Sequence, residues 1–441
     1  MRSGSSTRTL LSTTMGYGLV EVLSRCVQAA AIFVLASRYS KVDFGNFYTY
    51  FAAYQLITVL STGGLLESFI SGLAKCAPNS TEARRLGAAF VKRYLARSLS
   101  ISTIAVILAV GLERLANVKI SIAFFTAAIF GGSLYGLITF LSSYLTCSGL
   151  NRQAIILRTA YTISAYSLSV VIATRWGGIF SFFVGMCIAG IVTLLFVPRG
   201  ARLLKYFSAT SQSASIGAGS DWFLVPAVLN WFFWYGLVVC VQRYFGSAHA
   251  AELGFVNTIA SVLTMINSSV SQAWLSTYIL RIGASRSVTE AKNALVFKLQ
   301  SVFMMVIAVV VIVGYEILRT IKLPLASKYG DLGLELSVLL FSMSMSSMYF
   351  SAINSFAVYN EGRRLATISI AAYIASVAFL VLACYLFDVF GVYIGLAALV
   401  ISRGFAITYY AKKRFGAGFF DARLIAANLA LFAVVAFCFR A

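Results

Sequence analysis

The stretch from Ala366 to Leu386, ATISIAAYIASVAFLVLACYL, is 21 residues long and carries no charged side chain. As an α-helix with a rise of about 1.5 Å per residue it would be about 31 Å long, close to the ~30 Å hydrocarbon core of a bilayer. Arg363 and Arg364 precede the stretch and Asp388 follows it, so charges mark both ends. The stretch therefore predicts a membrane-spanning helix.

Apolar runs of this kind recur along the whole chain. Hydrophobic residues make up 60% of the 441 residues and charged residues only 11%, too few to cover the surface of a soluble domain. Backbone groups in lipid must be satisfied within their own segment, so we expect an all-α polytopic membrane protein. The predicted spans are 14–37, 46–70, 98–112, 119–146, 155–174, 178–197, 222–242, 254–280, 298–318, 332–358, 366–386 and 391–410. The final apolar run, 424–439, predicts either a thirteenth span or a membrane-buried tail.

The net charge of +21 comes from basic residues in short segments between the apolar runs. There they set topology and meet anionic lipid headgroups, so we expect membrane lipids and no nucleic acid as partners. One set of alternate connections carries 23 Lys and Arg residues and the other set carries 10. This excess predicts a cytoplasmic N-terminus.

A short pattern near the end of the first span recurs near the end of the seventh. Arg38-Tyr39 is followed by Phe44-Gly45 at the start of the second span, and Arg243-Tyr244 is followed by Leu253-Gly254 at the start of the eighth. Six spans separate the two copies, so both halves would keep the same orientation, as in parallel repeats related by an axis along the membrane normal. The alternative is that both are ordinary interfacial anchors.

The repeat divides the chain into two six-helix bundles, 1–197 and 222–410. The segment between them, 198–221, is basic and then rich in Ser and Gly, which predicts a flexible cytoplasmic linker. Residues 411–441 form a basic loop followed by the apolar tail or extra helix.

Charged residues inside predicted spans are candidates for function, because a charge at mid-membrane costs about 2.5–3.5 kcal/mol on insertion scales. Glu21 and Arg25 lie four residues apart, on one helix face. Arg25 would offer positive charge to an anionic substrate and Glu21 would hold it; a structural ion pair is the alternative. Arg403 has no acidic residue within four positions and is the best candidate for substrate contact in the second half. A partner on another helix, Asp221 or Glu67, is its alternative explanation.

Other polar side chains are candidates for the same site. Arg38 and Arg243, at the outer ends of spans 1 and 7, would flank one periplasmic opening, where two guanidiniums suit a pyrophosphate. Interfacial anchoring explains them equally well. Asn230 and Asn257 would bind sugar hydroxyls, although bonding between helices is the commoner use of such amides.

Catalysis and cofactors have little support in the sequence. His249 is the only histidine, and the seven cysteines form no CxxC motif, so we expect no metal site and no Cys/His catalysis. No Walker loop or HExxH motif occurs, and we expect no cofactor. Glu67 and Glu316, near the ends of spans 2 and 9, are candidates for H⁺ or Na⁺ coupling; simple solvation is the alternative.

Three stretches carry a family resemblance: Gly16 to Glu21, Arg38 to Tyr48, and Ser61 to Leu65. Together they resemble the opening of the Wzx-type O-antigen and exopolysaccharide repeat-unit flippases. These belong to the multidrug/oligosaccharidyl-lipid/polysaccharide (MOP) exporter superfamily. The resemblance implies a MATE-like pair of six-helix bundles in the bacterial cytoplasmic (inner) membrane, alternating in access around a cationic central cavity. Arg25 and Arg403 match that cavity by their depth.

The resemblance also implies the cargo, an oligosaccharide linked to undecaprenyl pyrophosphate and destined for surface polysaccharide. We therefore expect a transporter, a monomer that also contacts other membrane proteins of polysaccharide assembly. One alternative is a multidrug or small-molecule antiporter of the same fold. Another is a membrane enzyme of polysaccharide assembly, such as a polymerase or ligase, which the short periplasmic connections disfavour.

Overall fold

The computed structural model describes residues 24, 26–73, 76, 80–116, 121–148, 150–197, 220–282, 285–321, 328–329, 332–359, 361–416 and 421–440. All regular elements among these residues are helices, which confirms the all-α prediction. Ten of the described helices are long and apolar enough to cross a membrane, and two shorter apolar helices accompany them, Cys26–Arg38 and Ile179–Leu195. The protein is a multi-pass membrane protein.

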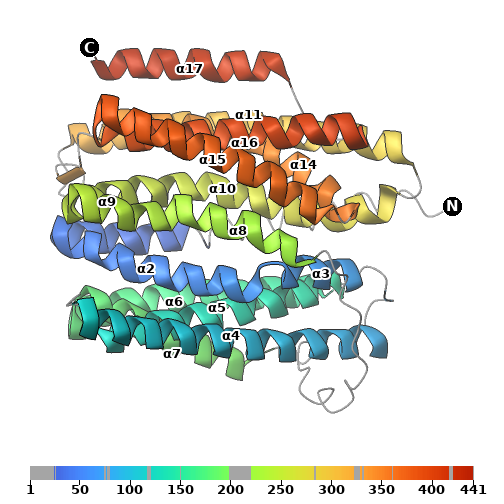
Figure 1. Ribbon diagram of the computed structural model, residues 1–441, viewed down its shortest axis with the longest axis horizontal. Coiled ribbons are helices and arrows are strands. Elements are labelled where there is room, and N and C mark those ends of the chain that lie inside the picture. The colour runs from blue at the N-terminus through green and yellow to red at the C-terminus, as the bar shows by residue number, and fades with distance from the viewer. Residues whose placement is uncertain are drawn as a thin grey trace. The chain divides into compact units, whose positions relative to one another are not determined.

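The chain forms two compact units, Met1–Ala250 and Ala251–Ala441. After the helix Cys26–Arg38, the first unit contains α2 (Lys41–Thr62), α3 (Leu65–Leu73), α4 (Thr81–Ala116), α5 (Ile122–Cys147), α6 (Asn151–Ile172), the short η1 (Ala173–Gly177) and η2 (Ile179–Ser181), α7 (Phe182–Leu195), η5 (Ser220–Phe223), α8 (Leu224–Trp231), η6 (Phe232–Gly236) and α9 (Leu237–Phe245). Within it α5 packs against α2, α6 and α7 (Figure 1). Rings of Phe47, Phe51, Tyr54 and Phe183 fill its core.

Helix α10 (Ser247–Ile282) leads from the first unit into the second. The second unit continues with α11 (Arg286–Thr320), α13 (Gly333–Ser344), α14 (Ser347–Val358), α15 (Gly362–Phe387), α16 (Phe390–Phe415) and α17 (Ala422–Arg440). The uncharged stretch 366–386 lies inside α15, which packs along α16 (Figure 1). Helices α13 and α14 form one span, broken at Met345 and Ser346, and most of this span is buried inside the unit.

Three helices begin at least seven residues earlier than the apolar runs predict. The runs 98–112, 298–318 and 254–280 correspond to α4, α11 and α10, which begin at Thr81, Arg286 and Ser247. The segment between the predicted spans 46–70 and 98–112 is therefore largely helical, because α4 already begins at Thr81.

Packing explains the early start of α4. Ala83 and Phe90, seven residues apart on one face of its first turns, are buried, while Arg85 and Lys92 on the other face are exposed. Such a helix continues beyond the hydrocarbon layer because its apolar face has a partner, and hydropathy alone places its start too late.

The helix boundaries bear on the internal repeat. An interval of 205 residues separates Arg38 from Arg243, and the same interval separates Thr81 from Arg286, the first residues of α4 and α11. The shared spacing supports a repeat of the first three spans. The expected match of Phe44-Gly45 with Leu253-Gly254 at helix starts was wrong, because α10 begins at Ser247.

The helices α8 and α9, which we expected to open the second bundle, lie in the first compact unit. They pack against α2, and the indole nitrogen Nε1 of Trp231 donates a 2.9 Å hydrogen bond to the carbonyl oxygen of Ala52. The apolar run 424–439 forms α17, which contacts α13 and is long enough to be a candidate span.

Candidate functional site

The side chain of Arg403 lies in the interior of the second unit. Helix α16 carries it, and only 8% of the residue is exposed. Its Nη1 donates a 2.6 Å hydrogen bond to the hydroxyl of Tyr373 on α15. Its Cζ lies 4.2 Å from the ring centroid of Tyr349 on α14 and 5.6 Å from that of Tyr373. Two neighbouring helices thus hold the guanidinium by one hydrogen bond and two cation–π contacts.

The break between α13 and α14 lies on the same span as Tyr349 and is rich in buried serines. The hydroxyls of Ser344 and Ser346 donate to carbonyl oxygens three residues earlier, at Phe341 and Met343. Serine hydroxyls that bond to nearby carbonyls compete with the helical ladder, which accounts for a break at this position. Asn267 of α10 donates from Nδ2 to the hydroxyl oxygen of Ser346 at 2.8 Å, so the break is tied to a neighbouring helix.

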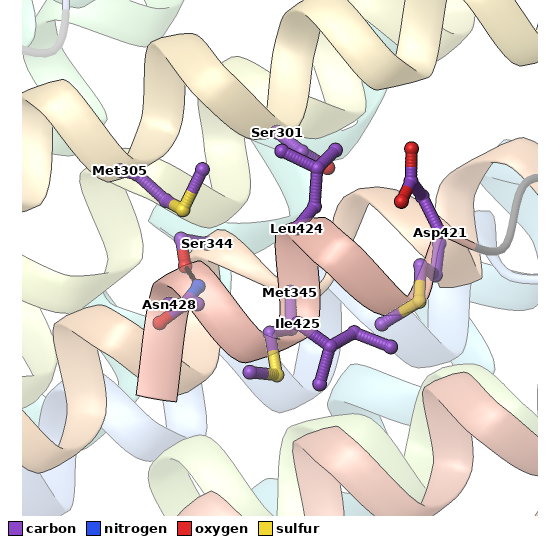
Figure 2. Close-up of a pocket in the computed structure, with 9 residues that line it drawn as sticks. Ser301, Met305, Ser344, Met345, Asp421, Leu424, Ile425 and Asn428 are labelled. Carbon is purple, nitrogen blue, oxygen red and sulfur yellow. Dashed lines mark hydrogen bonds between the residues drawn. The ribbon is translucent and has the colours of Figure 1, made fainter. Parts of the chain in front are cut away.

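A small pocket lies beneath the start of α17 (Figure 2). Its lining residues come from α11, the α13–α14 break and α17: Ser301, Met305, Ser344, Met345, Met348, Asp421, Leu424, Ile425 and Asn428. Asn428 donates to the hydroxyl oxygen of Ser344, and the two side chains face each other in Figure 2. Near the pocket Asp421 forms a 3.1 Å ion pair with Lys298. The hydrogen bond from Lys298 lowers the pKa of the Asp421 carboxyl below its usual value.

Arg38 and Arg243 are exposed and lie at the same end of the first unit. Tyr39, next to Arg38, donates a 2.5 Å hydrogen bond to the carbonyl oxygen of Ala173. Gln242, next to Arg243, donates from Nε2 to Asn46 Oδ1 at 2.6 Å. The ends of the helix Cys26–Arg38, of α6 and of α9 therefore meet around the first turns of α2.

The remaining candidates are spread over the chain. Glu21 and Arg25 lie outside the described residues, and Glu67 lies in α3. Glu316 pairs with Arg319 on α11 at 3.4 Å. Asn230 is half-buried in α8, and Asn257 is buried in α10. Among the predicted residues that the structure describes, Arg38 and Arg243 lie at the same end of one unit.

Sequence reasoning missed the two tyrosines beside Arg403. Tyr349 and Tyr373 are two of 23 tyrosines, and no local pattern distinguishes them. It also missed Arg175-Trp176, which follows α6 in η1. A signal for this pair was present, because it is an Arg-aromatic dipeptide at a helix end, like Arg38-Tyr39 and Arg243-Tyr244.

No protein-family model matches the chain, and no curated protein matches it. Solved structures do. An inward-facing multidrug resistance MATE family transporter of the MOP superfamily aligns with a TM-score of 0.68 and 13% identity over 90% of this chain and 98% of that chain. A MATE protein in the straight conformation gives 0.66 and 15%, over 92% and 95%. The Vibrio cholerae MATE transporter VcmN, in its bent form, gives 0.62 and 15%, over 91% and 98%.

The chain has the MATE fold. This confirms the fold expected from the sequence. Identities of 13–15% establish the arrangement of helices and leave the cargo open. Within the MATE fold of this chain, Arg403 places a positive charge among the buried helices of the second unit.

Proposed function

We propose that this protein moves an oligosaccharide linked to undecaprenyl pyrophosphate from the cytoplasmic to the periplasmic leaflet of a bacterial inner membrane. Three observations support the proposal: the MATE fold, the multi-pass architecture, and the buried cation Arg403. The buried cation Arg403 is the observation on which the proposal mainly rests. A buried guanidinium in a membrane helix is costly, and a pyrophosphate offers the oxygen pairs that a guanidinium binds best.

The contacts of Arg403 suit this role. Tyr349 and Tyr373 are neutral side chains at pH 7, so their contacts hold the guanidinium without cancelling its charge. The broken span α13–α14 carries Tyr349, and a break gives two half-helices room to shift against each other. We infer that Arg403 attracts the pyrophosphate while the prenyl chain stays in lipid. Alternating access then moves the sugar, and no covalent step is needed.

The test is translocation of a fluorescent undecaprenyl-pyrophosphate oligosaccharide in proteoliposomes. We expect the intact protein to expose the probe to an external quencher, Arg403→Gln to slow this at least tenfold, and Arg403→Lys to retain part of it. Arg85→Gln is the matched control, because Arg85 is an exposed arginine of α4. Folding of each variant is checked by its thermal unfolding midpoint.

The same vesicles distinguish the other functions. Exchange of a cationic dye against H⁺ or Na⁺ by a folded protein that does not move the lipid would replace the proposal with the multidrug antiporter. Translocation that is unchanged in Arg403→Gln would keep the flippase and remove Arg403 from its site. Imposed H⁺ and Na⁺ gradients, applied to Glu67→Gln and Glu316→Gln, test the two coupling candidates.

A further inference from the structure

One end of the first unit carries three Arg-aromatic pairs: Arg38-Tyr39, Arg175-Trp176 and Arg243-Tyr244. Each pair lies where a helix ends. Arg38 is the last residue of the helix Cys26–Arg38, Arg175-Trp176 lies in η1 directly after α6, and Arg243-Tyr244 lies in the last turn of α9. Two of the pairs precede a glycine with positive φ, Gly178 at 73° and Gly246 at 95°. Glycine adopts this conformation without steric cost, so the chain turns sharply after each pair.

Hydrogen bonds bring the three helix ends together. The hydroxyl of Tyr39 donates to the carbonyl oxygen of Ala173, two residues before Arg175. Asn46 Oδ1, in the second turn of α2, accepts from Gln242 at 2.6 Å and from the hydroxyl of Ser247 at 3.1 Å. Gln242 and Ser247 lie on either side of the pair Arg243-Tyr244. The three pairs therefore form one rim, which we call the arginine rim.

The arginines of the rim are available to a ligand. Arg38, Arg175 and Arg243 are exposed, and none of them makes a hydrogen bond or ion pair with another residue in the described part of the chain. The residues Trp176 and Tyr244 are 77% and 82% exposed. Asp43, the acidic residue closest to Arg38 in sequence, accepts a 2.6 Å hydrogen bond from the Ser40 hydroxyl and forms no ion pair with the three arginines in the described part of the chain.

The predicted topology makes this charge unexpected. It puts the rim on the periplasmic side, where Lys and Arg are the minority. Arginines on the periplasmic side do not set the orientation of the protein in the membrane, so their presence there indicates another function. A guanidinium binds a phosphate through two parallel hydrogen bonds, and an exposed aromatic ring offers a flat apolar face to a sugar. Arginine beside an aromatic ring, three times on one rim, suits a ligand that contains both groups.

We propose that the arginine rim binds the diphosphate and the first sugar of the lipid-linked oligosaccharide on the outer leaflet, after translocation. The inference rests on the proposed function and adds a release site to it. Phosphate is a chemistry shared with ordinary phospholipid headgroups, so the experiment must separate the two sources.

The test measures binding of geranyl-diphosphate-linked N-acetylglucosamine to the full-length protein in nanodiscs of phosphatidylcholine, by titration calorimetry. We expect Arg38→Gln, Arg175→Gln and Arg243→Gln each to raise the dissociation constant about tenfold, as for loss of one hydrogen bond to a charged group. Trp176→Leu should weaken binding of this probe but leave binding of inorganic pyrophosphate unchanged. Arg85→Gln is the control. All measurements are repeated in the Arg403→Gln background, so that binding at Arg403 does not contribute.

Each outcome separates the rim from the proposed function. Probe binding that needs the three arginines, in a protein that moves no lipid, would support the rim and reject the flippase. Suppose instead that the intact protein translocates the lipid but does not bind the probe, or binds it equally well after substitution of the three arginines. The release site at the arginine rim would then be rejected and the flippase proposal would stand. If the arginine variants lose retention of added phosphatidylglycerol but bind the probe normally, the rim is an anchor for headgroups and the proposal is overturned.

Discussion

The guanidinium of Arg403 lies over the ring of Tyr349, with Cζ 4.2 Å from the ring centroid. The two residues come from α16 and α14, which pack against each other in the second unit. A cation–π contact of this kind contributes about 0.5–2 kcal/mol, more where water is excluded. Because Tyr349 follows the break at Met345 and Ser346 by less than one turn of helix, movement at the break would move the ring that holds the arginine.

Removal of the hydroxyl that Arg403 contacts should weaken the protein and its transport together. Tyr373→Phe deletes the 2.6 Å hydrogen bond and keeps the ring, so we expect a loss of about 1.5–3 kcal/mol in unfolding free energy. Denaturant titration in detergent micelles measures this loss. Tyr385→Phe on the same helix is the control, because Tyr385 is 86% exposed. Equal losses in the two variants would show that the bond to Arg403 contributes nothing.

At Gly45 two helices of the first unit approach so closely that an added side chain should destabilise the protein. A Cβ at Gly45 would overlap the carbonyl oxygen of Ser247, which belongs to the rigid first turn of α10. We expect Gly45→Ala to lower the unfolding free energy by about 1–3 kcal/mol. Gly111→Ala in α4 is the matched control, since a Cβ there meets no atom within 4 Å. That variant should gain about 0.5–1 kcal/mol, because alanine favours helix. Thermal unfolding of both variants checks the pair, and a stable Gly45→Ala protein would contradict the packing.

The positions of the spans could be predicted from the sequence because they depend on length and hydropathy alone. The stretch 366–386 lies inside α15, and the run 424–439 lies inside α17. Helix ends could not be predicted as well, because they depend on partners. α4 begins at Thr81 since its first turns have a buried face, which hydropathy does not register.

Part of the candidate site could likewise be predicted from the sequence, and part of it could not. Arg403 could be found because a charge within an apolar run is rare, and its burial agrees with that reasoning. Its partners Tyr349 and Tyr373 lie 54 and 30 positions away, on other helices, so only the folded chain identifies them. The serine-rich break has the same origin: serines are common in the chain, and only their bonds to Phe341 and Met343 mark this position.

The ion pair at the start of α17 predicts a pH dependence. The hydrogen bond from Lys298 holds the pKa of Asp421 below its usual value, so the folded pKa is lower than the unfolded one. The stabilisation is then fully present above the unfolded pKa of about 3.9 and is lost as pH falls through the folded pKa. We expect the unfolding midpoint of the intact protein to exceed that of Asp421→Asn at pH 7 and to equal it at a lower pH, below the folded pKa of Asp421. A difference that persists at the lower pH would assign the effect to packing.

Helix α17 should cross the membrane and place the C-terminus outside. Its 19 residues are about 28 Å long as a helix. Its contacts with α13 run antiparallel: Asn428 bonds to Ser344 at the broken middle of the span, and the ring of Phe439 covers Gly333 at the outer end. Alkaline phosphatase fused after Arg440 should therefore be active, and the same enzyme fused after Phe415, where α16 ends, should be inactive. A green fluorescent protein reporter should give the opposite pattern. Inactive phosphatase at both positions would mean that α17 lies along the cytoplasmic surface. The contact between Phe439 and Gly333 would then not form in the membrane.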